Sequence, residues 1–314
     1  MIIIKKYSEE NKDIWNKFIS NAKNSLFMFD RNYMDYHKDR FKDHSLLFYN
    51  DDELIALLPA SEHGKELRSH GGLTYGGFIT SDKIKQHSMN DCFSALKEYC
   101  VGNGYSKMLY KSIPHIYHLQ PAEEDRYSLY LNDAKIESIE ASTVINLSAP
   151  LKMPKGRKAQ ISRARREGVV IEERTDDESF HQFIDLENAV LEEHHGIDAV
   201  HTGDELSLLH SRFPKNIHLV AATLAGNMIA GTVLFEYKNT VHTQYMAADN
   251  KARELGALDL AIKTVIDKYS GDKLWLDFGI STEDGGRYLN QGLISQKEGF
   301  GGRTNTYEKW ILKF

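Results

Sequence analysis

Three consecutive β-rich runs, followed by one amphipathic helix and another strand, are the feature that most limits how this chain can fold. The runs at 217–222, 228–237 and 241–247 are separated only by short turn-type connections and therefore predict an antiparallel meander. Between 252 and 269 the apolar residues recur at intervals of three and four, and 274–278 alternates as a strand. A helix that crosses over to a further strand requires a mixed sheet, so a β-sandwich is excluded.

The amino-terminal half repeats this order loosely. A strand at 2–7 and a helix precede a hairpin over 45–58, and a second helix ends near Gly102. Further strands are expected at 108–111, 127–131 and 143–147. We therefore predict an α/β protein with mixed sheets (α+β in its strand pairing), built as two tandem copies of one architecture: an N-terminal domain over 1–150 and a C-terminal domain over 151–314.

Composition and charge limit the partners that the chain can have as a whole. Of its 314 residues 41% are apolar and 27% are charged, which is ordinary for a soluble globular protein, and the net charge of −6 argues against a chain-wide grip on nucleic acid. The one strongly basic segment is a predicted helix over 152–167, ahead of the second domain, with seven basic residues against one acid. It is either a solvated helix face or a contact for an anionic ligand or a nucleic acid.

Cysteine usage and hydropathy indicate the compartment. Cys92 and Cys100 fall in one predicted helix about 12 Å apart, so they cannot form a disulfide within it. No run of about 18 uncharged apolar residues predicts a membrane span, and the apolar run at 2–4 is shorter than a signal-peptide core. A reducing, cytoplasmic location fits this pattern. The oligomeric state is not indicated.

Three short sequence segments of the second domain, taken in their order along the chain, indicate a family resemblance. The basic stretch 157–168 leads into the strand 169–172, then come Leu-Asp-Phe-Gly at 276–279 and Gln-Lys-Glu-Gly-Phe-Gly at 296–301. With the crossover helix, they resemble the Fem-type (FemAB-like) tandem-GNAT transferases and their bacterial acetyltransferase relatives, over essentially the whole chain. The resemblance implies two GNAT-like (acyl-CoA N-acyltransferase) domains and transfer of an acyl group onto an amine, without a metal or a covalently bound cofactor.

The resemblance also implies a phosphate-binding turn, Arg/Gln-x-x-Gly-x-Gly/Ala, at the start of the crossover helix. Arg253, Gly256 and Ala257 would form this turn, although Leu258 stands at its last position, so acyl-CoA is only partly supported as the donor. Free N–H groups at a helix start bind phosphate, but Gly256 and Ala257 could equally allow tight helix packing. The alternative donor is an aminoacyl-tRNA, whose phosphates the 152–166 segment would hold.

The fourth strand of the second domain carries the first candidates for catalysis, since acyl transfer needs a base, fixed oxyanion donors and a proton for the leaving group. Strand alternation places His242, Gln244 and Met246 on one face and Tyr245 on the other. His242 is a candidate base or substrate ligand, against the alternative of a satisfied core histidine. Gln244 would contact substrate, and Tyr245 or Tyr288 could protonate the leaving group.

Asp277 lies mid-strand between two apolar residues, where an ionised carboxylate needs a partner. It could orient His242 or an amine, or it could form a structural ion pair with Lys297 or Arg303. The loop-rich region after this strand is expected to contribute further substrate-binding residues. The full set of substrate-binding candidates is Gln244, Tyr75, Ser281, Asn290, Lys297 and Glu298.

Tyr75 belongs to a glycine-rich segment, 69–77, which stands in the fourth-strand position of the first domain. Such a segment could bend and admit a ligand, or it could be a plain loop. A second histidine group, His194 and His195 with His201 beyond, lacks the zincin spacing, so no metal site is expected.

We therefore expect an acyltransferase that moves an acyl group from acyl-CoA onto a small-molecule amine. The amine would be an amino sugar or an amino acid bound between the two domains. Two alternatives stay open. One is an aminoacyl-tRNA-dependent Fem-type aminoacyl or peptidyl transferase, with tRNA as its partner. The other is a degenerate scaffold that binds a ligand without catalysis. The motifs of nucleotide hydrolysis and serine hydrolysis are absent from the sequence.

Overall fold

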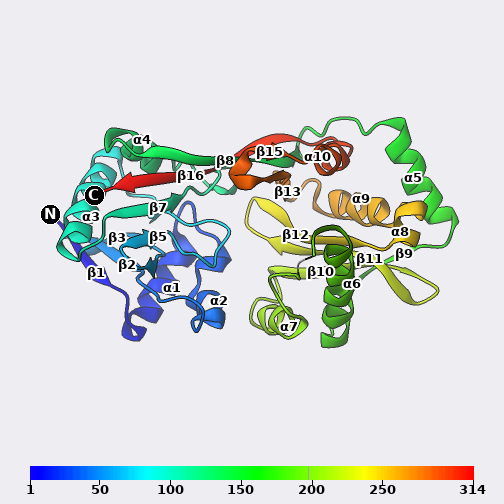
Figure 1. The fold of residues 1–314 in the computed structure, drawn as a ribbon, viewed down its shortest axis with the longest axis horizontal. Helices are drawn as coiled ribbons and strands as arrows, with labels where there is room; N and C mark the ends of the chain where they lie inside the picture. Colours follow the sequence, from blue (N-terminus) through cyan, green and yellow to red (C-terminus); the bar gives the residue numbers. More distant parts are fainter. Residues whose placement is uncertain (197) are drawn as a thin grey trace. The chain divides into compact units, whose positions relative to one another are not determined.

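The computed structural model describes residues 1–196 and 198–314 and divides the chain into two compact units (Figure 1). The first unit comprises 1–140, 282–288 and 306–314, and the second comprises 141–281 and 289–305. Strands β8 (Lys135–Asn146) and β16 (Arg303–Lys313) therefore each contribute residues to both units. The expected division at residue 150 does not include this exchange, because hydrophobic alternation within a strand does not reveal which half of the chain pairs with it.

The second unit is built on the sheet order β8-β13-β12-β11-β10-β9. Its further strands are β9 (Val170–Arg174), β10 (Ile217–Leu224), β11 (Asn227–Glu236), β12 (Thr240–Ala248) and β13 (Trp275–Ile280). Its helices are α5 (Lys155–Arg166), α6 (Asp177–His195), α7 (Gly203–Arg212), α8 (Asn250–Leu255), α9 (Ala257–Tyr269) and α10 (Gln291–Glu298). Strands β12 and β13 pair in parallel and the other pairs are antiparallel, so the predicted mixed sheet and crossover helix are confirmed.

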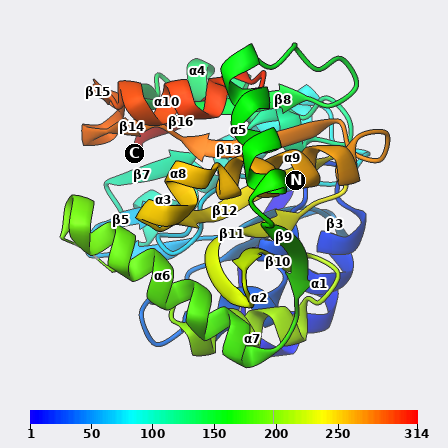
Figure 2. The ribbon, with the colours of Figure 1, turned by 90° about the vertical axis from the view of Figure 1, so that its right-hand side faces the viewer.

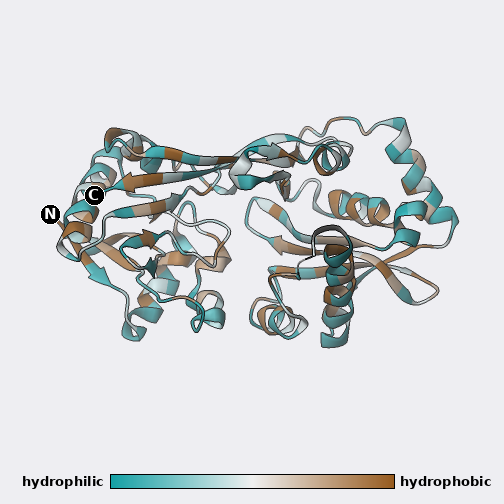
Figure 3. Cartoon of the chain, viewed as in Figure 1, coloured by the Kyte–Doolittle hydropathy of each residue, from teal (hydrophilic) through white to brown (hydrophobic). Residues whose placement is uncertain are grey.

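Helices cover both faces of this sheet (Figure 2). On one face α5 and α9 pack into an apolar core that includes Ile161, Val241 and Leu276. On the other face lies α6, and the lack of a side chain at Gly231 lets Phe183 of α6 approach the backbone of β11. Figure 3 shows α5 mostly in the hydrophilic colour, as expected of a helix that buries only a narrow apolar stripe.

The first unit has two sheets where one was expected. One has the order β1-β2-β3-β6, and the other has the order β4-β5-β7 followed by β16 and β8. The strands are β1 (Ile2–Lys6), β2 (Leu46–Asn50), β3 (Glu53–Leu58), β4 (Ser61–His63), β5 (Glu66–Arg68), β6 (Ile79–Thr80) and β7 (Lys107–Lys111), and the short strands β14 (Thr282–Glu283) and β15 (Tyr288–Leu289) form a separate pair. The helices are α1 (Lys12–Asn21), α2 (Arg31–Met34), α3 (Gln86–Gly102) and α4 (Glu124–Leu131).

The strand predicted at 127–131 is wrong, because these residues belong to α4. Tyr127 and Tyr130 favoured a strand by composition, but the buried residues Asp125, Ser128 and Leu129 recur at helical spacing and pack inward. The carboxylate of Asp125 accepts a hydrogen bond from Tyr110 Oη of β7 at 2.5 Å, which ties the helix to the sheet. Tertiary contacts thus override the local preference for a strand.

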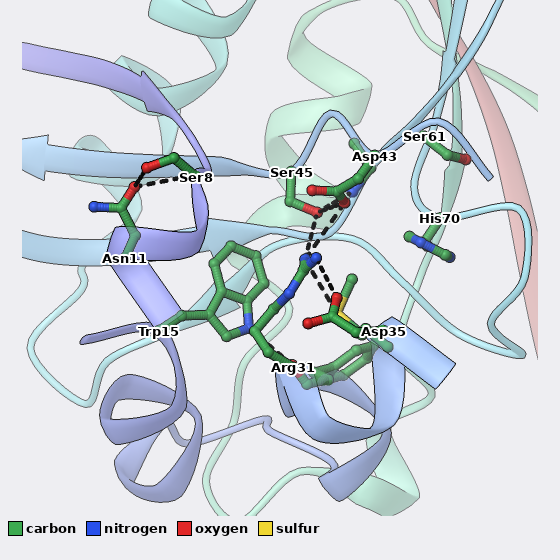
Figure 4. Close-up of polar contacts among 12 residues, drawn as sticks. Ser8, Asn11, Trp15, Arg31, Asp35, Asp43, Ser45, Ser61 and His70 are labelled. Atoms are coloured by element: carbon green, nitrogen blue, oxygen red, sulfur yellow. Dashed lines mark hydrogen bonds and ion pairs between the residues drawn. The ribbon is translucent and has the colours of Figure 1, made fainter. Parts of the chain in front are cut away.

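A buried arginine fastens the small helices of the first unit to its strands (Figure 4). Arg31 donates to Asp35 at 2.6 Å and Asp43 at 3.4 Å, and its guanidinium lies over the ring of Tyr7, 3.8 Å from the centroid. Two carboxylates and an aromatic ring compensate the buried charge. All of these partners belong to the protein, so the arrangement explains structure and offers no ligand site.

Candidate functional site

A cavity of about 630 Å³ lies in the second unit where the sheet opens. Its walls come from β12, from both ends of the α8–α9 junction and from α5, α6 and α10. The residues that line it are Arg157, Gln160, Glu187, Val190, Leu191, Met246, Ala248, Ala252, Arg253, Gly256, Leu258, Asp259, Leu293 and Gln296. Its volume is in the usual range for sites that bind small molecules or cofactors.

The opening follows from a short parallel ladder. Strands β12 and β13 pair over three residue pairs, the last of which joins His242 to Asp277. Strand β12 continues to Ala248, but beyond that last pair no described residue of β13 pairs with it. Backbone N–H and C=O groups on this edge of β12 therefore lack a ladder partner and can bond a ligand.

A β-bulge changes which side chains share a face of β12. The register on either side of it is Val233 with Tyr245 and Leu234 with Thr243. Gln244 is the extra residue, and one extra residue reverses the alternation. His242 and Tyr245 consequently share the face covered by α6, while Met246 lies on the other face. The predicted alternation is therefore wrong beyond Gln244, because a bulge leaves no mark on hydrophobic periodicity.

His242 and Asp277 form a buried hydrogen-bonded pair. Asp277 is fully buried, and its Oδ2 lies 3.1 Å from His242 Nδ1. Its Oδ1 accepts from Ser142 Oγ at 2.5 Å and from the Gly279 amide at 3.0 Å. Because a carboxylate only accepts, it fixes the imidazole with its proton on Nδ1 and leaves Nε2 as the basic nitrogen. The contact is the one expected between Asp277 and His242. Of the two cations considered as alternative partners of Asp277, Arg303 donates to the Gly302 carbonyl and Lys297 donates to backbone carbonyls.

Lys297 is buried and holds the last two residues of β13. Its Nζ donates to the carbonyl oxygens of Gly279 at 3.0 Å and Ile280 at 2.7 Å. Burial lowers the pKa of Lys297 to about 8, although nearby Asp277 acts in the opposite direction. Ser281 is also buried, and its hydroxyl has no hydrogen-bond partner among the described residues. These two predicted substrate residues thus lie inside the protein, beside β13.

Tyr245 is held by a loop. Its hydroxyl lies 2.6 Å from His201 Nδ1 and 3.3 Å from the His201 amide. Burial raises the pKa of Tyr245 to about 12, so the phenol stays protonated at neutral pH. Tyr245 does not line the cavity, whereas Arg253 and Gly256 of the predicted phosphate turn do.

Gly256 is required by packing as well as by the chain turn. It has φ of +76° at the α8–α9 junction, and a Cβ there would lie 2.8 Å from the carbonyl oxygen of Gln160 on α5. Ala257 is fully buried beneath the junction. Tight helix packing, the alternative considered for these residues, is therefore present, although the first turn of α9 still faces the cavity through Leu258 and Asp259.

One ion pair occupies the wall beside this turn. Arg157 of α5 bonds the Asp259 carboxylate, donates to the Gln296 carbonyl at 2.9 Å and covers the Phe300 ring at 4.3 Å from its centroid. Burial raises the pKa of Asp259, and Arg157 opposes that shift. Arg157 thus spans α9 and α10 and brings a cation to the cavity next to Arg253.

Glu187 of α6 lines the cavity and was not among the predicted site residues. It is 7% exposed, and its Oε2 has no hydrogen-bond partner among the described residues. Burial raises the pKa of Glu187 to about 7. A sequence signal existed: the residue interrupts an apolar stripe at helical spacing. The stripe runs through Phe180, Phe183, Ile184, Glu187, Val190 and Leu191.

The other predicted substrate residues lie away from the cavity lining. Asn290 caps α10 by accepting from the Leu293 amide at 3.0 Å, and Glu298 is a partly exposed residue of the same helix. Tyr75 belongs to the first unit, where its buried hydroxyl bonds those of Tyr117 at 2.8 Å and Tyr307 at 2.7 Å. The structure therefore does not bring Tyr75 to the cavity of the second unit as a lining residue.

Within the described part of the chain, no group of three metal-ligating side chains is close enough to hold an ion. The side chains of His194 and His195 lie outside the described residues, so the histidine group named in the sequence is not described as a whole. No described helix has the length and hydropathy needed to cross a bilayer.

A mixed sheet that opens beside its crossover helix, with a cavity at the opening, is the arrangement expected of the GNAT fold. The acetyltransferase (GNAT) domain family model matches residues 155–288. GNAT domains typically use acetyl-CoA as co-substrate. A search of curated proteins by sequence finds no match.

Solved structures of low sequence identity share the fold over nearly the whole chain. FemX has a TM-score of 0.71 at 10% identity, with 99% of this chain and 97% of that chain covered. L-PGS from Bacillus licheniformis has a TM-score of 0.64 at 14% identity, covering 98% and 92%. A tandem GNAT protein from the clavulanic acid biosynthesis pathway has a TM-score of 0.53 at 10% identity, covering 100% and 98%. The resemblance to tandem-GNAT, FemAB-like proteins is thereby confirmed at the level of the fold.

Proposed function

We propose that the protein is an N-acyltransferase whose second unit holds an activated acyl donor in the cavity beside β12, and that the donor is an acyl-CoA. The observation that carries this proposal is the cavity itself. It opens where β12 and β13 part, so unpaired backbone groups meet the space next to the start of α9. Arg253 brings a cation to the same space, which suits the phosphates of a coenzyme A thioester. Arg157, the other arginine of the wall, is paired with Asp259.

His242 and Asp277 complete the proposal. The amine must lose a proton as it attacks, and His242, whose Nδ1 lies against Asp277, is the candidate base. His242 is buried next to the open edge of β12 and is not itself a lining residue of the cavity. The carbonyl oxygen becomes negative in the transition state, and an N–H on the open edge of β12 would stabilise it. Tyr245, whose phenol keeps its proton at neutral pH, is the candidate acid for the leaving thiolate.

The test is calorimetric titration with acetyl-CoA, together with release of free thiol in the presence of a panel of amino acids and amino sugars. Arg253→Gln should weaken acetyl-CoA binding about tenfold, because a charge-assisted contact to phosphate is lost. Lys251→Gln is the matched control, since Lys251 is an exposed cation of the same helix and does not line the cavity. Absence of both binding and thiol release with the wild-type protein would refute the acyl-CoA proposal.

A second donor is favoured by a specific observation on α5. Among the described residues, no acid pairs with its exposed cations. They are Lys155, Lys158, Arg163, Arg165 and Arg166. A row of uncompensated cations next to the donor cavity suits a nucleic acid, and the donor would then be an aminoacyl-tRNA. A protein of the same fold is named a putative lysylphosphatidylglycerol synthetase, although at 11% identity this likeness concerns the fold alone.

Binding of an RNA hairpin with the tRNA acceptor-stem shape separates the two donors. If α5 holds phosphates, log Kd should rise steeply with log salt, and each cation removed should reduce the slope by about 0.7 to 0.9. A flat salt response would exclude tRNA. Binding of acetyl-CoA without thiol release from any amine of the panel would favour a degenerate scaffold over both enzymes.

A further inference from the structure

We infer that Glu187 is the acceptor-amine residue of the cavity: its carboxylate binds the ammonium group of an aliphatic primary amine and takes the proton that the amine loses during acyl transfer. This inference rests on the proposed acyltransferase function and names the acceptor class and a second base for it. It is carried by the position of Glu187 in the cavity wall and by the contacts that its carboxylate lacks.

The Glu187 carboxylate is buried but makes no hydrogen bond or ion pair with a described residue that would stabilise the fold. The side chain is 7% exposed and lies on the α6 face that packs against β11 and β12. Its Oε2 accepts no hydrogen bond from any described residue. A buried carboxylate without a partner is costly for a protein, so a ligand that supplies the missing cation and N–H donors explains its presence.

The charged and titratable groups around Glu187 do not supply that cation. The neighbour on β12 is Tyr245, which His201 holds by a hydrogen bond, and Glu205 of α7 also acts on Tyr245. Across the cavity, Arg157 is bonded to Asp259. Burial raises the pKa of Glu187 to about 7, and no charge of a described residue, Arg253 of the cavity wall included, contributes to that shift. The carboxylate can therefore exchange a proton near neutral pH.

The neighbours of Glu187 also indicate the kind of amine. The next turn of α6 places Val190 and Leu191 in the same wall, so carbon rather than polar groups would surround the stem that bears the amine. An ammonium group at the end of an aliphatic stem fits an apolar wall with one carboxylate. An amino sugar, with hydroxyl groups on each side of its amine, fits this wall less well.

The step balances without any further reactant. The ammonium gives one proton to the Glu187 carboxylate, and the nitrogen lone pair attacks the acyl carbonyl carbon. The N–C bond forms and the C–S bond of the thioester, or the C–O bond of an ester donor, breaks with its electron pair leaving on the donor. In all, the nitrogen gives up two of its three protons. Glu187 passes the first to solvent, the second leaves the nitrogen once the N–C bond has formed and ends on the leaving group, and the amide keeps the third.

The experiment compares wild type, Glu187→Gln and Glu193→Gln, with acetyl-CoA as donor and cadaverine, lysine and glucosamine as amines. Glu193 is an exposed acid on the same helix and serves as the matched control. Glu187→Gln should lower kcat/KM for the aliphatic amines by at least tenfold and abolish the limb of the pH profile near 7. Its affinity for acetyl-CoA and its thermal stability should not fall, because the carboxylate supports neither.

Each outcome of this experiment is decisive. If wild type and Glu187→Gln transfer the acyl group equally well with the same pH profile, the inference is overturned while the proposed function stands. If acetyl-CoA binds but glucosamine is the better acceptor and Glu187→Gln affects both classes alike, the assigned amine class is wrong. If wild type neither binds acetyl-CoA nor releases thiol, the proposed function fails and this inference fails with it. A lower melting temperature of Glu187→Gln alone would assign the residue a structural role.

Discussion

Each unit contains a short parallel ladder between two strands. Beyond the end of that ladder the first unit places its own side chain, whereas the second unit has a cavity. In the first unit the parallel ladder of β5 and β7 ends with Arg68 opposite Leu109, just as that of β12 and β13 ends with His242 opposite Asp277. Beyond that point β7 bonds the loop that follows β5. Lys111 Nζ donates to the carbonyl oxygens of His70 at 3.1 Å and Leu73 at 2.5 Å.

The second unit leaves the corresponding backbone edge to a cavity. There the wall residues include Glu187, whose Oε2 has no partner among the described residues. Where the protein itself bonds its buried polar groups, these groups have a structural role. Where a buried polar group faces a cavity without a partner, a ligand can bond it. The comparison teaches that the repeated architecture alone does not indicate a site.

The largest expected effect concerns the packing that forms the cavity wall. Gly256→Ala places a Cβ 2.8 Å from the Gln160 carbonyl oxygen at φ of +76°, so α5 must move away from the α8–α9 junction. We expect a loss of about 3 kcal/mol in the free energy of unfolding, measured by denaturant titration. Gly226→Ala is the control, because Gly226 has φ of +83° but nothing within 4 Å of its Cβ position, and it should cost about 1 kcal/mol. Equal costs would mean that α5 does not close this wall.

The next effect concerns Lys111, which fills the space beyond the β5–β7 ladder of the first unit. Burial lowers the pKa of Lys111 to about 8 from 10.5, so between these values the unfolded chain binds more protons than the folded one. Lys111 should therefore contribute a rise in stability from about pH 8 to about pH 10.5, on the order of 2 kcal/mol. Lys111→Met should remove this part of the pH dependence and leave the part that comes from Lys297, whose pKa is also lowered to about 8. Unfolding midpoints across this pH range provide the measurement.

Lys111→Met also separates the two units functionally. Because Lys111 belongs to the first unit, the affinity of the second unit for acetyl-CoA should change less than twofold in the variant. A large loss of affinity would contradict the assignment of the donor site to the second unit alone. A pH dependence unchanged by the substitution would instead assign the titration to Lys297, which has a similarly lowered pKa of about 8.

The sequence predicted the second unit better than the first for physical reasons. Long alternating strands and an amphipathic α9 leave clear periodicities, and these placed the crossover helix correctly. Short strands such as β4 and β5, with three residues each, are too brief for alternation to show. The exchange of β8 and β16 between units depends on pairing partners, which local pattern does not encode.

The site was predictable only where a residue type was out of place locally. Asp277 in an apolar strand gave such a signal, and its contact with His242 is present. Glu187 gave the same signal within an apolar helical stripe but was not selected. The bulge at Gln244 had no signal, and it moved Tyr245 onto the face of His242. The roles of all these residues in catalysis stay predictions.

Asp277→Asn tests the catalytic role of the His242–Asp277 pair at the end of the β12–β13 ladder. Without the carboxylate the imidazole of His242 loses its fixed proton position, so turnover should fall at least tenfold, or about 1.4 kcal/mol in activation free energy. Asp267→Asn, at an exposed position of α9, should leave turnover unchanged. Circular dichroism checks that both variants are folded. Unchanged turnover in Asp277→Asn would remove Asp277 from the mechanism and make this ladder end as structural as that of the first unit.

The smallest effect should come from the exposed face of α5. Arg163 and Arg166 make no ion pair with any described residue, so replacing both with Gln should change the free energy of unfolding by less than about 0.5 kcal/mol. Arg157→Gln on the same helix is the contrast, because it removes the bond to Asp259 and leaves that buried carboxylate without its cation. A substantial loss of stability in the double variant would mean that this face is structural, and the case for an anionic partner on α5 would then fall.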